Sequence, residues 1–318
     1  EKAGAVADAK GAVLIASGAS LTSVFANRPR VFGMMAPSVK YLTTAIEAVV
    51  TKGTVTTVSF LQEDVGFTRA ACSVLPELGK LHGFEVLQGE TLPKNFAKAN
   101  VVAAVKRLKV AAPDVLVACV YSDVCHMLLQ AAYVINFNVK ALILTICATE
   151  AAFVQSVGWE QSQYVVGAVP WAATLSLASS MTTWKASTFT EEYKTYYSSA
   201  ELPAYIAASA FGACEALVWA IETANSSDPS AVADVLRSMD QQSIFGRIAF
   251  DSNGQSVNDM KAVQFQMSDM YTAVAPQDVA QSEMVYPKPS YIELRCLDSS
   301  KTFLPYGYTV DQKTGKSA

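Results

Sequence analysis

Short apolar runs alternate with amphipathic segments along most of the chain. The runs are continuously apolar, as expected for parallel strands that are buried on both faces. They predict strands at Ala12–Ala16, Val55–Leu61, Phe84–Leu87, Val115–Val120, Ala141–Thr145, Tyr164–Val169, Arg247–Phe250 and Val263–Met267. Between them, apolar residues recur at helical spacing. This spacing predicts helices at Tyr41–Lys52, Thr68–His82, Asn95–Val110, Asp123–Ile135, Thr188–Ser198, Tyr205–Thr223 and Ser230–Met239.

The regular alternation of strand and helix predicts an α/β fold with parallel sheets covered by helices on both faces. Ala36-Pro37 and Val169-Pro170 each follow a strand-like segment and divide the pattern into blocks. We interpret them as crossovers between two lobes. The pattern ends at Pro287, and we expect residues 291–318 to form a connector or a tail.

Composition narrows the class of protein. The 318 residues suffice for two lobes with their own cores, and 51% hydrophobic against 16% charged residues argues against disorder. A net charge of -4 argues against a nucleic-acid surface. The longest apolar runs are interrupted by polar residues such as Asp123 and Glu150, so we expect no membrane span. The start at Glu1 lacks the pattern of a signal peptide, as a trimmed chain also would.

The cysteines and histidines do not form a recognisable metal site. There are 6 cysteines and 2 histidines, without a CxxC pair, so a zinc site is poorly supported and we predict no cofactor. An even number of cysteines permits disulfides without fixing their pairing. A local disulfide among Cys119, Cys125 and Cys147 and free buried thiols both stay open. No Ser-His-Asp, Cys-His or paired-carboxylate set suggests catalysis.

Two segments suggest ligand binding. Gly11–Ser20 is an apolar strand that ends in a loop of small residues, whose backbone N–H groups can bind an anion at a helix start. Phe245–Gln255 is a short strand closed by an Asp-Ser-Asn-Gly turn, in which Gly254 can adopt a positive φ. We interpret the two as opposite ends of a ligand-binding clamp.

Together with other segments, these two resemble the type I periplasmic binding protein fold, in its branched-chain amino acid receptor branch. The same fold occurs in the ligand-binding regions of metabotropic glutamate and natriuretic peptide receptors. No single motif is specific, and the resemblance depends on the order of the segments over most of residues 11–290. The matching segments are Ile15–Ser20, Arg30–Ser38, Val58–Phe67, Asp114–Tyr121 and Phe245–Gln255.

The resemblance implies two doubly wound parallel-sheet lobes around a hinged cleft. The N-terminal lobe would comprise residues 1–37 and 170–258, and the C-terminal lobe residues 38–169 and 259–290. The first β-α-β units of the N-terminal lobe would lie outside this chain, upstream of Glu1. The lobes would close by hinge motion at Pro37, Pro170 and a third strand near Val257.

The resemblance also implies a ligand site. In the family, the loop at Gly18, Ala19 and Ser20 holds a ligand carboxylate, whereas the alternative is a tight turn with Ser20 as a helix N-cap. Tyr121, with Ser122 after it, ends a strand where the family often has an aromatic residue facing the ligand. The alternative is a tyrosine packed between the lobes.

Two further positions are candidates for the ligand site. Thr145 to Cys147 end the next strand, where amino acid binders carry an acid for the ligand ammonium. Here the nearest acid, Glu150, comes several residues later, which argues against an amino acid ligand because an unpaired buried ammonium is costly. Trp171 either covers the ligand or packs at the hinge.

We therefore expect a non-catalytic, extracellular or periplasmic protein, either a transport-associated binding protein or a receptor ectodomain, that binds a small solute resembling an amino acid, carboxylate or amide. Its partners would be a membrane transporter or a fused membrane segment, with a homodimer possible and no nucleic acid. The alternative is a structural or assembly subunit that kept the fold without the ligand, and an enzyme ranks last.

Overall fold

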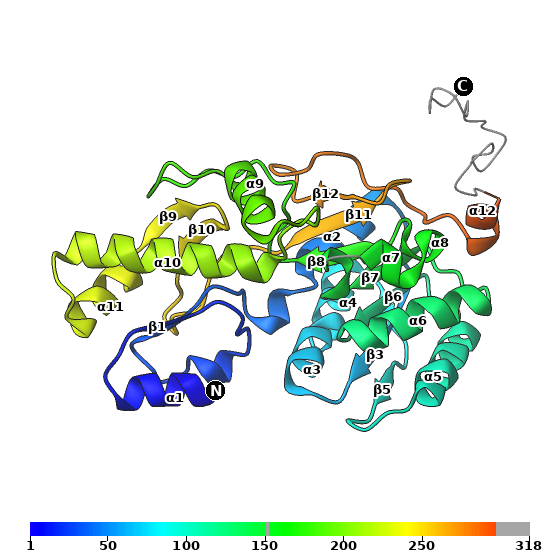
Figure 1. Cartoon of the computed structure of the whole chain (residues 1–318). Coiled ribbons are helices and arrows are strands. Elements are labelled where there is room, and N and C mark those ends of the chain that lie inside the picture. Colours follow the sequence, from blue (N-terminus) through cyan, green and yellow to red (C-terminus); the bar gives the residue numbers. More distant parts are fainter. Residues whose placement is uncertain (151–152, 297–318) are drawn as a thin grey trace.

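The computed structural model describes residues 1–150 and 153–296 (Figure 1). Two halves lie side by side, with the amino terminus near their boundary. The first half contains α1 (Lys2–Ala9), β1 (Leu14–Ala16), the 3-10 turn η1 (Thr22–Val24), β2 (Val31–Gly33), α9 (Ala186–Tyr197), α10 (Tyr205–Ala224), α11 (Pro229–Arg237), β9 (Asp240–Ser243) and β10 (Gly246–Ala249).

The second half holds the larger sheet and most of the remaining helices (Figure 1). Its elements are η2 (Ser38–Lys40), α2 (Thr43–Lys52), β3 (Thr57–Glu63), α3 (Gly66–Cys72), α4 (Leu75–His82), β4 (Glu85–Val86), β5 (Glu90–Leu92), α5 (Lys98–Ala111), β6 (Val115–Cys119), α6 (Ser122–Val134), β7 (Ala141–Leu144), η3 (Cys147–Thr149), α7 (Phe153–Val157), α8 (Trp159–Ser162), β8 (Val166–Val169), β11 (Lys261–Phe265), β12 (Tyr271–Ala275) and α12 (Tyr291–Arg295).

The eight-stranded sheet confirms the predicted α/β class. Its strand order is β12-β11-β8-β7-β6-β3-β4, and β5 also pairs with β3. The strands from β3 to β8 pair in parallel, whereas β11 is antiparallel to both β8 and β12. The carboxyl ends of β3, β6 and β7 therefore meet at one edge of the sheet.

Strand β6 shows why the central strands have no polar positions. Val115, Val117 and Cys119 belong to the core on one face, beneath α2, α3 and α4. Leu116 and Ala118 belong to the core on the other face, with α5 and α6. Since helices cover both faces, neither side of the strand meets water.

The first half contains much less sheet than the second. Among the described residues it contains a two-stranded parallel sheet of β1 and β2 and an antiparallel pair of β9 and β10. Much of its packing comes instead from α10, which contacts α11 and β1. The core on the α5 and α6 face of the large sheet also includes residues of the first half, such as Phe32 and Ala216. The two halves therefore share one apolar cluster.

Several predicted elements need correction. The predicted helix Thr68–His82 is divided into α3 and α4, because Pro76 favours the first turn of a new helix over a helix interior. The strand predicted at Val263–Met267 begins earlier, at Lys261. Strands β5, β9 and β12 were not predicted. Strand β5 has three residues and β9 has the polar sequence Asp-Gln-Gln-Ser, so both lack the apolar run that marks a buried strand. Strand β12 has five residues, as many as β6, and was missed although three of them are buried.

The prediction that no segment could span a membrane also needs correction. By length and composition alone, α10 is long and apolar enough to cross a membrane. In the fold, 39% of its most apolar 18-residue stretch is buried. Glu215 in its middle is buried and accepts hydrogen bonds from the hydroxyls of Thr182 (2.6 Å) and Ser243 (2.7 Å). These contacts and the packing against α11 make α10 part of the first half of the fold.

The predicted connector or tail starts with an ordered segment. Ser290 caps α12 by accepting a hydrogen bond from the Glu293 amide, and Tyr291 and Leu294 are buried. Just before it, the Lys288 ammonium lies over the Tyr291 ring, 4.1 Å from its centroid. Burial lowers the pKa of Lys288 to about 7.

Replacing Lys288 by methionine should therefore change how stability depends on pH. Above pH 7 the folded state loses the Lys288 proton, while the unfolded state keeps it up to its ordinary pKa near 10.5. The unfolded state then binds more protons, so this residue makes the wild type gain stability as the pH rises from 7 to 9.5. Over this pH range, we expect the free energy of unfolding of the wild type, measured with urea, to rise by about 1 to 3 kcal/mol more than that of Lys288→Met. Parallel pH profiles for the two proteins would contradict it.

Candidate ligand-binding cleft

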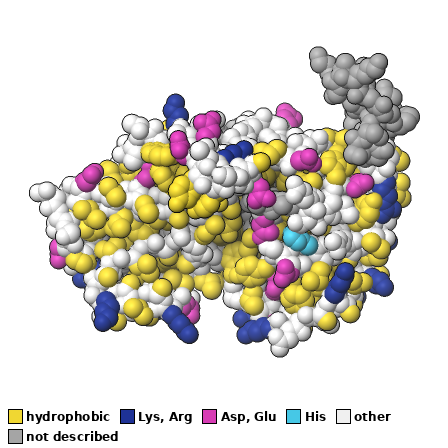
Figure 2. Space-filling model, in the orientation of Figure 1, with side chains coloured by type: hydrophobic (Ala, Val, Ile, Leu, Met, Phe, Trp, Pro, Cys, Tyr) yellow, Lys and Arg dark blue, Asp and Glu magenta, His cyan; other side chains and the backbone are white. Residues whose placement is uncertain are grey.

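A cavity of about 470 Å³ lies between the two halves. Figure 2 shows that a notch on the lower edge separates the halves of the molecular surface. The cavity takes its lining from the amino terminus, the loop after β1, the starts of α3 and α10, and the segments after β6 and β7. The lining residues are Glu1, Lys2, Gly18, Ala19, Ser20, Leu21, Val24, Tyr41, Phe67, Tyr121, Ile146 and Tyr205.

The loop at Gly18–Ser20 is held from behind by polar contacts. The Ser38 hydroxyl donates to the Ser20 hydroxyl (3.0 Å), and the Ser38 amide donates to the Ser20 carbonyl (2.9 Å). The predicted helix start is only the 3-10 turn η1, whose N-cap is Leu21 without a side-chain bond. Ser20 is therefore not an N-cap, and little helix dipole is available to an anion there. The loop can offer its backbone amides and the Ser20 hydroxyl.

The Asp251–Gln255 turn supports this loop instead of forming the opposite side of a clamp. As predicted, Gly254 adopts a positive φ of 80°. The side-chain amide of Gln255, which is fully buried, donates to the Ser20 carbonyl (2.8 Å). Ser252, Asn253 and Gly254 line a different cavity. The clamp interpretation was wrong because the turn lies behind the loop.

Aromatic rings form much of the remaining lining. The ring centroids of Tyr41 and Phe67 are 5.0 Å apart, and those of Phe67 and Tyr121 are 5.9 Å apart. Tyr205 faces the same cavity from the first half. Burial raises the pKa of the Tyr41, Tyr121 and Tyr205 phenols above the ordinary value. These phenols therefore stay protonated at neutral pH, as hydrogen-bond donors with apolar faces.

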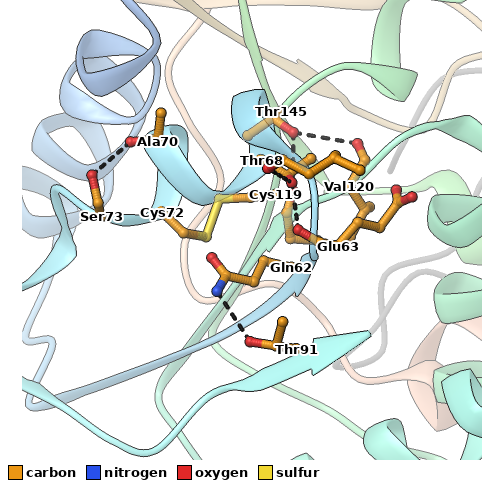
Figure 3. Close-up of a disulfide and its surroundings, with 12 residues drawn as sticks. Gln62, Glu63, Thr68, Ala70, Cys72, Ser73, Thr91, Cys119, Val120 and Thr145 are labelled. Carbon is orange, nitrogen blue, oxygen red and sulfur yellow. Dashed lines mark hydrogen bonds between the residues drawn. A yellow bond between two sulfur atoms is a disulfide. The ribbon is translucent and has the colours of Figure 1, made fainter. Parts of the chain in front are cut away.

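Tyr121 is positioned by the neighbouring strand and by a disulfide. Its backbone amide donates to the carboxylate of Glu63, the last residue of β3 (2.5 Å). The disulfide between Cys72 and Cys119 joins the end of α3 to the end of β6 (Figure 3). Because α3 carries Phe67 and β6 leads into Tyr121, this bond connects two aromatic positions of the lining.

A second disulfide lies on the other side of Tyr121. It joins Cys125 in the first turn of α6 to Cys147, directly after Ile146. The local disulfide considered from the sequence therefore exists, with this pairing. Cys119 is paired with Cys72 instead, and Cys214 and Cys296 are free and exposed. Together the two bonds brace the segments that supply Phe67, Tyr121 and Ile146.

Four predicted site residues do not line this cavity. The Ser122 hydroxyl donates to the Glu150 carboxylate, and the buried Thr145 hydroxyl donates to the Ala118 carbonyl (3.2 Å). Cys147 is committed to its disulfide. Trp171 is 1% exposed and donates through its ring nitrogen to the Ile244 carbonyl (2.9 Å), which is the packing alternative. Only Gly18, Ala19, Ser20 and Tyr121 come together.

The sequence did contain a signal for the aromatic residues that were missed. Phe67 lies in the first turn of α3, Tyr205 is the first residue of α10, and Tyr41 follows η2 two residues before α2 begins. Tyr121, which was predicted, is the N-cap of α6. All four stand at or just before the start of a helix, where the chain turns at the cleft.

Few charged residues line the cavity. Glu1 and Lys2 are the charged residues that line it, and Glu150 lines a neighbouring cavity instead. Within residues 1–150 and 153–296, no group of three or more His, Cys, Asp and Glu side chains could hold a metal ion. The described lining therefore offers amides, hydroxyls and rings, with one carboxylate at the amino terminus.

Comparisons with known proteins agree with this architecture. The family model described as periplasmic binding protein matches residues 1–270. A putative branched-chain amino acid ABC transporter protein from Silicibacter pomeroyi superposes with a TM-score of 0.72 at 17% identity, covering 89% of this chain and 77% of that chain. A periplasmic binding protein from Burkholderia mallei gives 0.70 at 16% identity, covering 89% and 76%.

Another similar structure is a solute binding protein of an ABC transporter from R. palustris, in complex with benzoate. Its TM-score is 0.69 at 10% identity, and the match covers 90% of this chain and 74% of that chain. At such identities these structures show the fold, whereas the family model covers most of the sequence. The chain belongs to the periplasmic binding protein family.

Proposed function

We propose that this protein binds a small solute with a carboxylate in the cavity between its two halves. The observation that carries the proposal is that Gly18–Ser20 and Tyr121 line one cavity although they are distant in sequence. The loop amides and the Ser20 hydroxyl would receive the carboxylate. The rings of Tyr41, Phe67 and Tyr121 would cover the rest of the ligand.

The lining favours an apolar or aromatic acid over an amino acid. An ammonium needs an acidic partner when it is buried, and Glu1 is the one acid among the described lining residues. Four aromatic rings suit a flat apolar body. Similar structures include complexes with benzoate, 3,4-dihydroxybenzoic acid and isoleucine. The first two resemble the ligand that we propose.

We also propose an extracytoplasmic location and two lobes with the predicted bounds, 1–37 with 170–258 and 38–169 with 259–290. Two disulfides support the location, because such bonds persist in oxidising compartments. The sheet supports the division, since its strands lie within the second pair of segments. The partner would be a membrane transporter or a fused membrane segment that reads lobe closure.

A thermal-shift screen tests the proposal. The panel contains benzoates, other small carboxylates, amino acids, amides and nucleobases. A ligand at 100 times its Kd should add about 2.7 kcal/mol of stability. We expect a carboxylate to raise the melting temperature, and Tyr121→Ala and Ser20→Ala to abolish most of this shift.

Tyr196→Ala is the matched control, because this tyrosine is 81% exposed and does not line the cavity. It should keep the full ligand shift. A folded wild-type protein that responds to nothing on the panel would contradict the proposal. That result would favour the assembly alternative, which the exposed apolar surface of α10 supports.

A further inference from the structure

Helix α10 carries a continuous apolar stripe on its exposed side. Its side chains recur at helical spacing, cover about 120° of the helix circumference and include no charged residue. Figure 1 places α10 across the front of the first half, where Figure 2 shows many hydrophobic side chains. The α10 stripe consists of Ile206, Ala210, Cys214, Leu217, Val218 and Ile221, all of them exposed.

A free thiol lies at the centre of the α10 stripe. Cys214 is midway between Ile206 and Ile221 along the helix, and it is exposed and unpaired. The neighbouring stripe residue one turn before it, Ala210, is also small. Small side chains at the centre and large ones at the ends let a second helix approach closely at the middle.

We propose that the α10 stripe is the interface of a symmetric dimer of this chain, linked by a disulfide between the two Cys214 residues. A two-fold axis through Cys214 packs the two α10 helices antiparallel. Each Ala210 then faces the partner copy's Val218, so a small residue meets a large one. Such self-complementarity is what an isologous interface requires.

The geometry of helix packing permits this bond. Packed helix axes lie about 8–10 Å apart, and Cα atoms lie about 2.3 Å from each axis. Facing Cα atoms at the contact point are therefore about 3.4–5.4 Å apart. That range overlaps the 4.4–6.8 Å that a disulfide needs.

Charge also favours the antiparallel arrangement. The nearest exposed charge on α10 is Glu222, directly after the stripe. In the dimer it lies opposite Ile206 of the partner copy, in the first turn of the helix. The amino-terminal end of a helix carries a partial positive charge, which attracts a carboxylate. The antiparallel arrangement also places the partial positive end of each helix beside the partial negative end of the other.

The small area explains why a covalent bond is part of the proposal. A 20-residue helix is about 30 Å long and about 10 Å wide, so the stripe buries roughly 300–400 Å² per partner, well below the ~800 Å² of a standard interface. The bond forms by thiol–disulfide exchange with a low-molecular-weight disulfide such as oxidised glutathione. Two Cys214 thiols become one S–S bond, and the oxidant leaves as two thiols.

The first test incubates the full chain with oxidised glutathione and measures linked dimer by non-reducing electrophoresis and light scattering. We expect a dimer that dithiothreitol converts to monomer. Cys214→Ser should reduce the linked dimer more than ten-fold. Cys296→Ser is the matched control, since it removes the other exposed thiol, and it should leave the dimer unchanged.

Two further variants test the packing. Val218→Glu keeps the thiol but places carboxylates in the stripe, and should slow linkage several-fold. Cys214→Ser combined with Ile221→Cys should form almost no linked dimer, because an antiparallel pair separates these positions by about 21 Å. Abundant linkage in that variant would overturn the arrangement. A wild-type protein that stays monomeric would overturn the dimer. This holds if another segment shields Cys214, and equally if phosphatidylcholine vesicles bind the stripe.

Discussion

Removing the Cys72–Cys119 disulfide is expected to lower the free energy of unfolding by about 4 kcal/mol. The bond closes a loop between residues that are 47 positions apart, and it restricts the unfolded chain accordingly. Both cysteines are buried, so alanine is the appropriate replacement. Urea unfolding of the Cys72→Ala, Cys119→Ala double variant measures the loss.

The same variant should also bind ligand more weakly. The bond joins the segments that carry Phe67 and Tyr121 (Figure 3), so its loss lets these rings move apart. Cys296→Ser serves as the control, because it removes an exposed, unpaired thiol and should leave the urea midpoint in place. An unchanged midpoint in the double variant would show that the bond contributes little.

Trp171→Ala is expected to cost about 3–5 kcal/mol of stability. The side chain is 1% exposed and packs edge-on against Phe189, with ring centroids 6.3 Å apart. Its removal also leaves the Ile244 carbonyl without the indole donor. The thermal or urea unfolding midpoint of the variant measures this effect.

Ligand binding separates this structural role from the predicted role of Trp171 as a ligand cover. Because Trp171 does not line the cleft cavity, Trp171→Phe should keep most of the stability and all of the ligand affinity. A large loss of affinity in a well-folded Trp171→Phe protein would restore the ligand role.

The sequence was most informative about the larger sheet. Strands such as β6 are buried on both faces, so hydrophobicity alone marks them. Strand β9 was not predicted because its side chains are polar, so no hydrophobic pattern marks it. It is a strand because its backbone pairs with β10. The division between α3 and α4 depended on Pro76, a single residue inside an otherwise regular helical pattern.

The candidate site was predicted in part, for a related reason. Gly18–Ser20 follow β1 and Tyr121 follows β6. These strands belong to different sheets, yet the residues after both of them line the cavity. Trp171 and Thr145 also follow strands, yet their side chains turn into the core. Sequence position gave the end of each strand, but not the direction of each side chain. Tyr205 belongs to an element from the other half, which only the folded chain brings to the cavity.

The two disulfides have a mechanical consequence. Both lie within residues 72–147, and within the described part of the chain no disulfide joins one half to the other. Phe67, Tyr121 and Ile146 thus belong to the half that the disulfides make more rigid. Gly18 and Tyr205 belong to the other half. When a solute binds, we therefore expect the first half to move and the second half, held by its two disulfides, to keep its shape.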